Sequence, residues 1–595
     1  MNTQPSDMPA SSTRPTPAPA TAGGFRPLRV WIPLLLLALM AVARFVPGMV
    51  QDGPSMIWMA SAFGPLLAGL GIVLWWLLLS RARWSERGVG LLGLILIFAA
   101  IVAGVDPSMR GPLTLVMTLP MGIAAFAIGV CLLGHRLSFQ RTWIGLLFAL
   151  LAASWSLLLQ NFGTRGDFAF ELDWRWNETA EQQFLADKAA GQLPTADESA
   201  VPAEELIDPP WPGFRGPQRD SAYRGAKFAD EWSSPPEELW RIKVGPAWSS
   251  FAVAGNYLFT QEQRGEEEVV VCYRAADGHE VWANGVQSRF FEALGGLGPR
   301  GTPTLADGRL YAMGAEGYLR CLHASDGSEV WRQDLREVAQ VAPPMWGFSS
   351  SPLVVDGIVA VHVGGEPIGV AAFDAASGQL RWSAAAGKQS YSSFQPVRLA
   401  DQFYVAILTD EGAQLFEPKS GELVLEHAWK HSGYRALQAQ LVDENKLLIP
   451  TGMGSGTRLV ELTADSNGQL HANELWTSRE MKPDFNDLVV HDGYIYGFDD
   501  RIFACISLVD GQRQWKRGRY GKGQVLLLAD SGLLLVMAES GEIALLRADP
   551  GEYQELAKFE ALGGKTWNHP VVVGDRLFVR NAQEAACYRL PLAAN

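Results

Sequence analysis

The stretch VCYRAADGHEVW, Val271 to Trp282, decides the fold, because close copies of it recur along the chain. Each copy is a short apolar run, an Asp-Gly or Ser-Gly pair, and a second run that ends on tryptophan. Glycine supplies the positive φ that a tight hairpin needs, and the Asp or Ser before it bonds locally to the turn. Repetition at this interval indicates a repeat architecture built from hairpins. The other strong copies are RCLHASDGSEVW (Arg320–Trp331), AAFDAASGQLRW (Ala371–Trp382) and ACISLVDGQRQW (Ala504–Trp515).

A second hairpin pattern between these copies sets the number of repeats. Alternating apolar runs break at a Gly, Asp or Asn turn eight times, beginning near Ser249, Gly301, Ser350, Phe394, Leu437, Phe485, Gly523 and Asn568. Seven repeats close on an aromatic residue: Trp282, Trp331, Trp382, Trp429, Trp476, Trp515 and Phe559. The eighth ends at residues 586–590 without a closing strand, whereas ELWRIKV at 238–244 precedes the first. We therefore predict an all-β propeller of eight four-stranded blades over residues 211–595, with the last blade completed by the early strand.

Residues 25–160 have the composition of a membrane domain. Five apolar runs lie at 28–46, 56–80, 88–105, 113–134 and 142–160. Each is about long enough to cross a hydrocarbon core, which needs roughly 20 helical residues, so we predict five transmembrane helices. Arginines precede the first run and occupy alternate loops, which places the N-terminus in the cytoplasm and the propeller on the periplasmic face of the inner membrane. None of the runs contains a buried carboxylate or a histidine pair, so no ion path is predicted.

Three remaining segments complete the organisation. Residues 1–24 are rich in Pro, Ser, Thr and Ala and are predicted to be a disordered cytoplasmic tail. Residues 161–210 are predicted to be an acidic, non-cytoplasmic linker with a short helix near 178–190. Residues 211–225 are dense in Pro and Gly, which favours a strap packed on the propeller, with a ligand loop as the alternative. The net charge of -14 gives no support to nucleic-acid binding, and the lipid bilayer is the expected partner.

The sequence WPGFRGP at 211–217, ahead of the repeated hairpins, resembles the quinoprotein-like propellers with pyrroloquinoline-quinone-type repeats. That class includes quinoprotein alcohol and glucose dehydrogenases, and also a non-catalytic propeller lipoprotein of the outer-membrane β-barrel assembly machinery. The membrane region ahead of the propeller resembles the layout of membrane-bound quinoprotein glucose dehydrogenases, which pass electrons to ubiquinone. The resemblance implies two possible functions, since the fold is shared by both. One is a membrane-anchored binding or assembly module. The other is a dehydrogenase that oxidises an alcohol or sugar with pyrroloquinoline quinone and calcium and reduces a membrane quinone.

The short propeller and the lack of a clear calcium-plus-base motif favour the binding module, whereas the five predicted spans and the cluster of side chains at the channel mouth favour the dehydrogenase. The propeller is shorter than those of the dehydrogenases it resembles, and the chain lacks the adjacent cysteine pair found in some of them. Four single cysteines occupy equivalent places in four blades, where we expect small buried apolar side chains, and no spacing typical of a zinc site occurs. These cysteines are Cys272, Cys321, Cys505 and Cys587.

The residues that enter the innermost strand of each blade should converge on one mouth of the central channel. Aromatic rings there suit stacking on a planar ligand, and Arg and Lys suit carboxylates. Asn486, Asp487 and Asn568 offer the hard oxygen atoms that calcium prefers, and Asp487 is the candidate catalytic base. The alternatives are structural: tryptophans packed between blades, a strand-capping Asp487 and cations that solvate a rim. The candidate cofactor-binding residues are Trp248, Arg300, Trp346, Asn486, Lys522, Trp567 and Asn568, and the same mouth includes Tyr391, Arg435 and His569. A small ligand or a protein partner is expected at this mouth.

Overall fold

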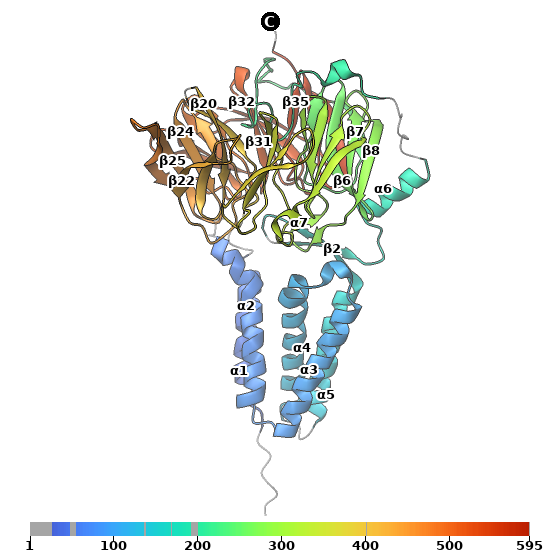
Figure 1. The fold of residues 1–595 in the computed structure, drawn as a ribbon. Coiled ribbons are helices and arrows are strands. Elements are labelled where there is room, and N and C mark those ends of the chain that lie inside the picture. The colour runs from blue at the N-terminus through green and yellow to red at the C-terminus, as the bar shows by residue number, and fades with distance from the viewer. Residues whose placement is uncertain are drawn as a thin grey trace, which may run out of the picture. The chain divides into compact units, whose positions relative to one another are not determined.

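The computed structural model describes residues 27–47, 55–135, 139–167, 169–191, 200–388, 390–399 and 401–593. The predicted tail at 1–24 lies outside these ranges, as do residues 192–199 of the predicted linker. The chain forms two compact units. One is helical and comprises residues up to Val105 together with Pro112–Leu157, and the other comprises Asp106–Gly111 and Leu158–Asn595 (Figure 1).

The helical unit contains the five predicted apolar segments as helices. The described residues include four helices that are long and apolar enough to cross a membrane, and the first segment is a shorter apolar helix of 15 residues. The helices are α1 (Trp31–Phe45), α2 (Ser55–Leu74) with a π-helical continuation (Trp75–Leu79), α3 (Trp84–Gly104), a π-helical turn (Thr114–Thr118) leading into α4 (Leu119–Leu132), and α5 (Gln140–Ser154) with a 3-10 continuation (Trp155–Leu158).

A buried ion pair connects two of these helices just outside the apolar runs, for which no buried carboxylate was predicted. Glu86 in the first turn of α3 binds Arg141 in the first turn of α5 through two bonds, 2.7 Å from Nε and 2.8 Å from Nη2. The Thr142 hydroxyl adds a third contact at 3.2 Å. Both charged side chains are almost fully buried. Glu86 and Arg141 precede the predicted runs 88–105 and 142–160, so the pair does not contradict that prediction. The two-bond geometry offsets the loss of hydration of both charges.

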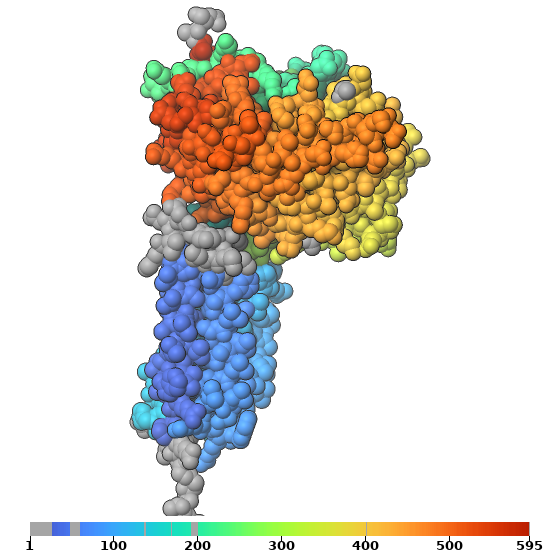
Figure 2. All heavy atoms as spheres, turned by 90° about the vertical axis from the view of Figure 1, so that its left-hand side faces the viewer, coloured from blue at the N-terminus to red at the C-terminus, as the bar shows by residue number. Residues whose placement is uncertain are grey.

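The second unit is an eight-bladed propeller of four-stranded antiparallel sheets, as predicted. In Figure 2 the colours pass from yellow through orange to red around it, because successive blades are neighbours in space. Blade 1 consists of β5 (Ala252–Ala254), β6 (Tyr257–Arg264), β7 (Glu267–Arg274) and β8 (Glu280–Gln287), and blade 2 of β11 (Thr304–Ala306), β12 (Arg309–Met313), β13 (Tyr318–His323) and β14 (Glu329–Asp334). Blade 3 consists of β15 (Leu353–Val355), β16 (Ile358–His362), β17 (Val370–Asp374) and β18 (Leu380–Ala384), and blade 4 of β19 (Gln395–Leu399), β20 (Gln402–Leu408), β21 (Gly412–Phe416) and β22 (Leu423–Ala428).

Blades 5 to 8 complete the ring, and the early strand closes it as predicted. Strand β4 (Glu237–Lys243) pairs antiparallel with β37, and Trp240 lies opposite Cys587. This pairing leaves the last blade without an open edge. Blade 5 consists of β23 (Gln440–Val442), β24 (Lys446–Thr451), β25 (Gly456–Ala464) and β26 (Leu470–Ser478), and blade 6 of β27 (Val489–His491), β28 (Tyr494–Asp499), β29 (Ile502–Ser507) and β30 (Arg513–Arg519). Blade 7 consists of β31 (Gln524–Leu528), β32 (Leu533–Met537), β33 (Glu542–Arg547) and β34 (Glu555–Glu560), and blade 8 of β35 (Val571–Val573), β36 (Arg576–Arg580), β37 (Glu584–Arg589) and β4.

The repeated tryptophans join each blade to the next. Trp331 lies in the outer strand of blade 2, and its indole N–H donates to the Ala375 carbonyl of blade 3 at 3.0 Å. Its ring also covers Gly378, where a Cβ atom would lie 2.6 Å from the ring and where φ is +72°. The turn glycine is therefore needed both for its backbone conformation and for the close approach of the tryptophan. Five other tryptophans make the same inter-blade bond: Trp240, Trp282, Trp382, Trp476 and Trp515.

Two of the predicted closing aromatics do not occupy this position. In each blade, a β-bulge between the two outer strands sets which residues lie opposite each other. In blade 4, Leu425 lies opposite Leu415, at the position that the closing tryptophan occupies in other blades, and Trp429 does not. In blade 7 the place belongs to Ala557, and Phe559 lies two residues further along the strand. The four predicted cysteines lie opposite the closing tryptophans of their blades, as buried free thiols.

The segment predicted as a linker is folded onto the propeller over its described residues. It begins with a hairpin, β1 (Leu159–Thr164) and β2 (Phe170–Trp174), and continues with α6 (Ala180–Ala189), close to the predicted short helix. Three of its charges form ion pairs with the blades: Glu181 with Arg289 (2.9 Å), Asp187 with Lys243 (2.6 Å) and Lys188 with Glu280 (2.6 Å).

Candidate ligand-binding site at the channel mouth

The Pro- and Gly-rich segment 211–223 is a strap that crosses the central channel. Trp211 exchanges backbone bonds with Val253 of blade 1, and Arg219 donates to two carbonyls of blade 3. On the other side of the ring, Arg215 donates to the Leu488 carbonyl of blade 6 at 2.8 Å. The strap then adds a short fifth strand, β3 (Ala222–Tyr223), to blade 7, parallel to β31. Contacts with blades on opposite sides of the ring mean that the strap spans the channel.

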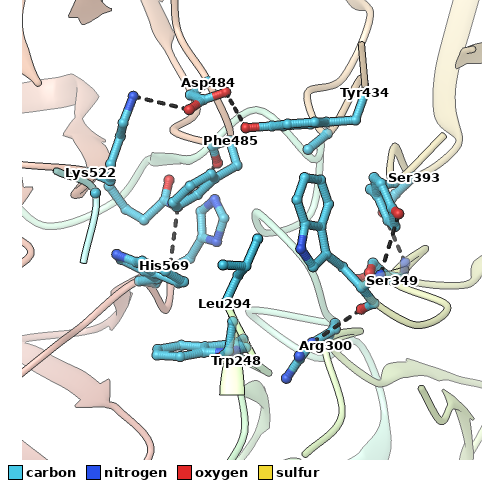
Figure 3. A pocket seen from close by; sticks show the side chains of 18 of the residues that line it. Trp248, Leu294, Arg300, Ser349, Ser393, Tyr434, Asp484, Phe485, Lys522 and His569 are labelled. Carbon is cyan, nitrogen blue, oxygen red and sulfur yellow. Dashed lines mark hydrogen bonds and ion pairs between the residues drawn. The ribbon is translucent and has the colours of Figure 1, made fainter. Parts of the chain in front are cut away.

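One cavity of about 230 Å³ lies at the mouth of the channel (Figure 3). Its walls come from the segments that enter the innermost strands, from the strap residue Phe214, and from the β1–β2 hairpin. Among the predicted site residues, seven line this cavity: Trp248, Arg300, Trp346, Tyr391, Lys522, Trp567 and His569.

Asp487, the predicted base, does not line the cavity. Its carboxylate is buried, lies 2.8 Å from Nε2 of His569 and forms an ion pair with Arg215 of the strap at 3.4 Å. Its backbone N–H donates to Gln524 of the next blade. This carboxylate therefore anchors the strap to blades 6 and 8.

The other predicted oxygen ligands and Arg435 are also used within the protein. Asn486 donates to the Gly523 carbonyl at 3.0 Å and accepts the Asp484 N–H at 3.2 Å. Asn568 donates to two carbonyls of blade 1, and its buried Oδ1 has no partner. The Arg435 guanidinium donates to the Thr409 and Trp429 carbonyls. Asn486, Asn568 and Arg435 are therefore buried inside the propeller and do not line the cavity.

These contacts test whether the site fits a quinone with calcium. Calcium takes six to eight oxygen ligands, whereas Asp487 is held by a guanidinium and Asn486 by two backbone groups. Within the described ranges, His, Cys, Asp and Glu side chains form no group of three or more that could hold a metal ion. The cavity is also smaller than the roughly 300–1,000 Å³ of a typical ligand pocket. The residues present do not fit this cofactor pair, and we derive no oxidation step from it.

Aromatic rings form two walls of the cavity. On one side, Trp346 meets Tyr434 edge to face at a centroid distance of 4.4 Å and lies 5.2 Å from Tyr391. On the other side, Trp567 lies 4.8 Å from Trp248 and 4.9 Å from Phe485. Such clusters bury much apolar surface and hold the rings rigidly. A ligand that enters the cavity therefore meets preformed apolar walls.

The charged residues at the mouth are already paired. Lys522 lies 3.0 Å from Asp484 and 2.5 Å from Asp500, and the Tyr434 hydroxyl donates to Asp484 at 2.6 Å; Figure 3 shows both side chains directed at that carboxylate. Arg300 donates to three backbone carbonyls and contacts Glu292, and burial lowers the pKa of Arg300 to about 10. These pairs fix the shape of the mouth.

The β1–β2 hairpin completes the wall of the cavity, a contribution that was not predicted from the sequence. Thr164 donates its backbone N–H to the Leu294 carbonyl at 2.6 Å, and Gly166 donates to Glu539. Lys565 lies over the Trp248 and Trp567 rings, donates to the Thr164 carbonyl at 3.0 Å and pairs with Glu171 of β2 at 3.0 Å. Only the acidic composition of the segment was visible in the sequence, and it indicated a solvated linker.

A belt of inter-blade hydrogen bonds also runs around the mouth. A backbone N–H at the start of one innermost strand donates to a side-chain oxygen at the same place in the next blade. The repeated Ser-Ser, Gly-Thr and Gln residues before these strands were visible in the sequence and could have indicated the belt. The donor and acceptor residues are Ser250 and Thr302 (2.9 Å), Thr302 and Ser351 (2.9 Å), Ser351 and Ser393 (2.8 Å), Ser393 and Gln438 (2.6 Å), and Asp487 and Gln524 (3.1 Å).

Comparisons with known proteins agree with this architecture. The family model described as outer membrane protein assembly factor BamB matches residues 235–393 and 267–517. The crystal structure of BamB from Moraxella catarrhalis is 14% identical, covers 61% of this chain and 100% of its own, and has a TM-score of 0.42. A quinohemoprotein alcohol dehydrogenase from Pseudomonas putida HK5 is 14% identical, covers 67% and 83% of the two chains, and has a TM-score of 0.46. No curated protein matches the chain. Through its propeller, the chain is similar to the BamB-type family of pyrroloquinoline-quinone-like repeats, as the hairpin repeat predicts.

Proposed function

We propose that the protein is a membrane-anchored binding or assembly module, which holds a ligand or a segment of a partner in the cavity at the channel mouth. The observation that carries this proposal is the state of Asp487. The one carboxylate expected to act as a base is buried between Arg215 and His569 and does not reach the cavity. The surface of the cavity is made of aromatic rings, hydroxyl groups and charges already held in pairs, which suits binding.

The place of the propeller follows from the arginine distribution of the membrane domain. Arginine-rich loops favour the cytoplasmic side, so the propeller is on the opposite face of the inner membrane. The binding cavity then serves a partner or ligand of that compartment. The multi-pass helical unit supplies the anchor.

Site-specific cross-linking tests the binding function. A photo-reactive amino acid at Met345, which is exposed and adjacent to Trp346, should give a discrete adduct in the native membrane. The same group at Val509, which is more exposed and lies in the outer turn of blade 6, serves as the control. The Met345 adduct should disappear in Trp346→Ala, which removes part of the aromatic wall. Equal adducts at Met345 and Val509 would count against a site at the mouth.

A quinone titration tests the rejected alternative. The full-length protein in a non-ionic detergent is mixed with pyrroloquinoline quinone and calcium chloride, and dye-linked oxidation of alcohols and sugars is measured. We expect no turnover. Turnover that is lost in Asp487→Asn would overturn the proposal and restore the dehydrogenase.

A further inference from the structure

We propose that the cavity binds the carboxylate of a small apolar acid, either a free acid or the carboxyl terminus of a polypeptide. The inference rests on the proposed function and specifies its ligand. The carboxylate lies against the hydroxyl groups of blades 2 to 4, and the apolar part lies between the aromatic walls.

The cavity contains a set of hydroxyl groups with hydrogen atoms to donate. Thr302, Ser351 and Ser393, here named the hydroxyl arc, line the cavity, and each oxygen accepts one backbone N–H of the preceding blade. The Tyr391 hydroxyl also lines the cavity and accepts the Trp346 N–H at 3.4 Å. Within the described part of the chain, none of these four hydroxyl groups donates to another residue. A carboxylate has about four lone-pair sites and suits such a cluster of donors.

A buried positive charge lies next to the hydroxyl arc. Arg219 of the strap is 5% exposed and donates to the Ser351 and Pro352 carbonyls at 2.9 and 3.0 Å. No carboxylate in the described ranges lies within ion-pair distance of it, and its Nε atom has no partner. Burial and, to a smaller degree, the charge of Arg215 together lower the pKa of Arg219 to about 9. A buried cation without a counter-ion favours an anion in its neighbourhood.

The remaining space in the cavity is small and largely apolar. Leu294, Phe485, Trp346 and Tyr434 contribute apolar surface to the walls. The cavity volume of about 230 Å³ lies below the roughly 300–1,000 Å³ of a typical ligand pocket, so the ligand that it suits is small. A six-carbon acid, or the last residue of a polypeptide, has this size.

Calorimetric titration of the full-length protein in a non-ionic detergent tests the inference. The probes are hexanoate and hexanamide, and acetyl-alanyl-leucine and its carboxyl-terminal amide. We expect the acid of at least one pair to bind about tenfold more tightly than its amide, since hydrogen bonds to a charged group are stronger. The pair that shows the difference identifies a free acid or a polypeptide terminus as the natural source.

Two variants separate the hydroxyl contact from a general effect. Tyr391→Phe removes one donor and keeps the ring, so it should weaken binding of the acid about fivefold to tenfold. Tyr494→Phe makes the same chemical change in β28, outside the cavity, and should leave the affinity unchanged.

Two results would overturn the inference: equal affinity for acids and amides, or equal effects of the two tyrosine variants. If no acid binds while the Met345 cross-link persists, the ligand class is wrong and the binding function stands. If the Met345 cross-link is absent while acids bind, the partner is a small molecule and assembly is excluded.

Discussion

The contact between a turn glycine and the tryptophan of the preceding blade can be tested by adding one methyl group. Gly378→Ala places a Cβ atom 2.6 Å from the Trp331 ring, at a position where φ is +72°. The left-handed conformation costs an alanine about 1–2 kcal/mol. Displacement of the buried ring adds about 1–3 kcal/mol, as overpacking does in other cores. The total loss of unfolding free energy is therefore about 2–5 kcal/mol.

A matched control lies in the same blade. Gly357 has a φ of +76°, and a Cβ atom there would meet nothing within 4 Å. Gly357→Ala should therefore cost only the backbone term of about 1–2 kcal/mol. The assay is urea unfolding of the full-length protein in a non-ionic detergent, followed by tryptophan fluorescence. Losses for the two variants that agree within about 0.5 kcal/mol would show that the glycine is needed for its backbone alone.

Three further perturbations address the hairpin, the pH dependence and the topology. Lys565→Met removes the ammonium group that binds the Thr164 carbonyl and Glu171, so amide hydrogen exchange in β1 should become about tenfold faster. The control, Lys558→Met, breaks an exposed ion pair and should leave hydrogen exchange in β1 unchanged. Burial raises the pKa of Glu268 to about 7, so the stability that its neutral form contributes is present below about pH 4 and is lost as the pH rises to about 7. Glu268→Gln should abolish that slope of stability against pH, and an unchanged slope would assign it to other groups. A reporter fused after Asn595 should be active only if it functions outside the cytoplasm, and one fused at Leu137 only if it functions inside it. Activity of a cytoplasmic reporter at Asn595 would show that the predicted membrane orientation is wrong.

The sequence predicts the blades well because their signals are local. A hairpin needs its turn residues and its alternating strands within about a dozen positions, and each blade repeats them. Ring closure by β4 was also predictable, because one strand was missing after Leu590 and one was in excess near Trp240. The register of blades 4 and 7 was not, since the bulge that places Leu425 depends on pairing with a strand and not on composition.

The site was predictable only in part, for a related reason. The entry positions of the innermost strands must converge, and the aromatic residues Trp248 and Trp346 at these positions line the cavity. Whether a polar side chain at such a position is free depends on its partner. The partner of Asp487 is Arg215, which the strap delivers from a distant part of the sequence. No local pattern around Asp487 indicates this pairing.

The same contrast explains where the binding properties of this propeller are encoded. The repeats supply a ring of inner strands and a belt of hydrogen bonds, and they would form a channel in any case. The strap crosses this channel and brings Phe214 to the cavity and Arg219 next to the hydroxyl arc. The β1–β2 hairpin adds a wall that Lys565 holds in place. Both segments precede the first blade, so the chemistry of the cavity depends on residues 159–223 as much as on the repeats that gave the fold.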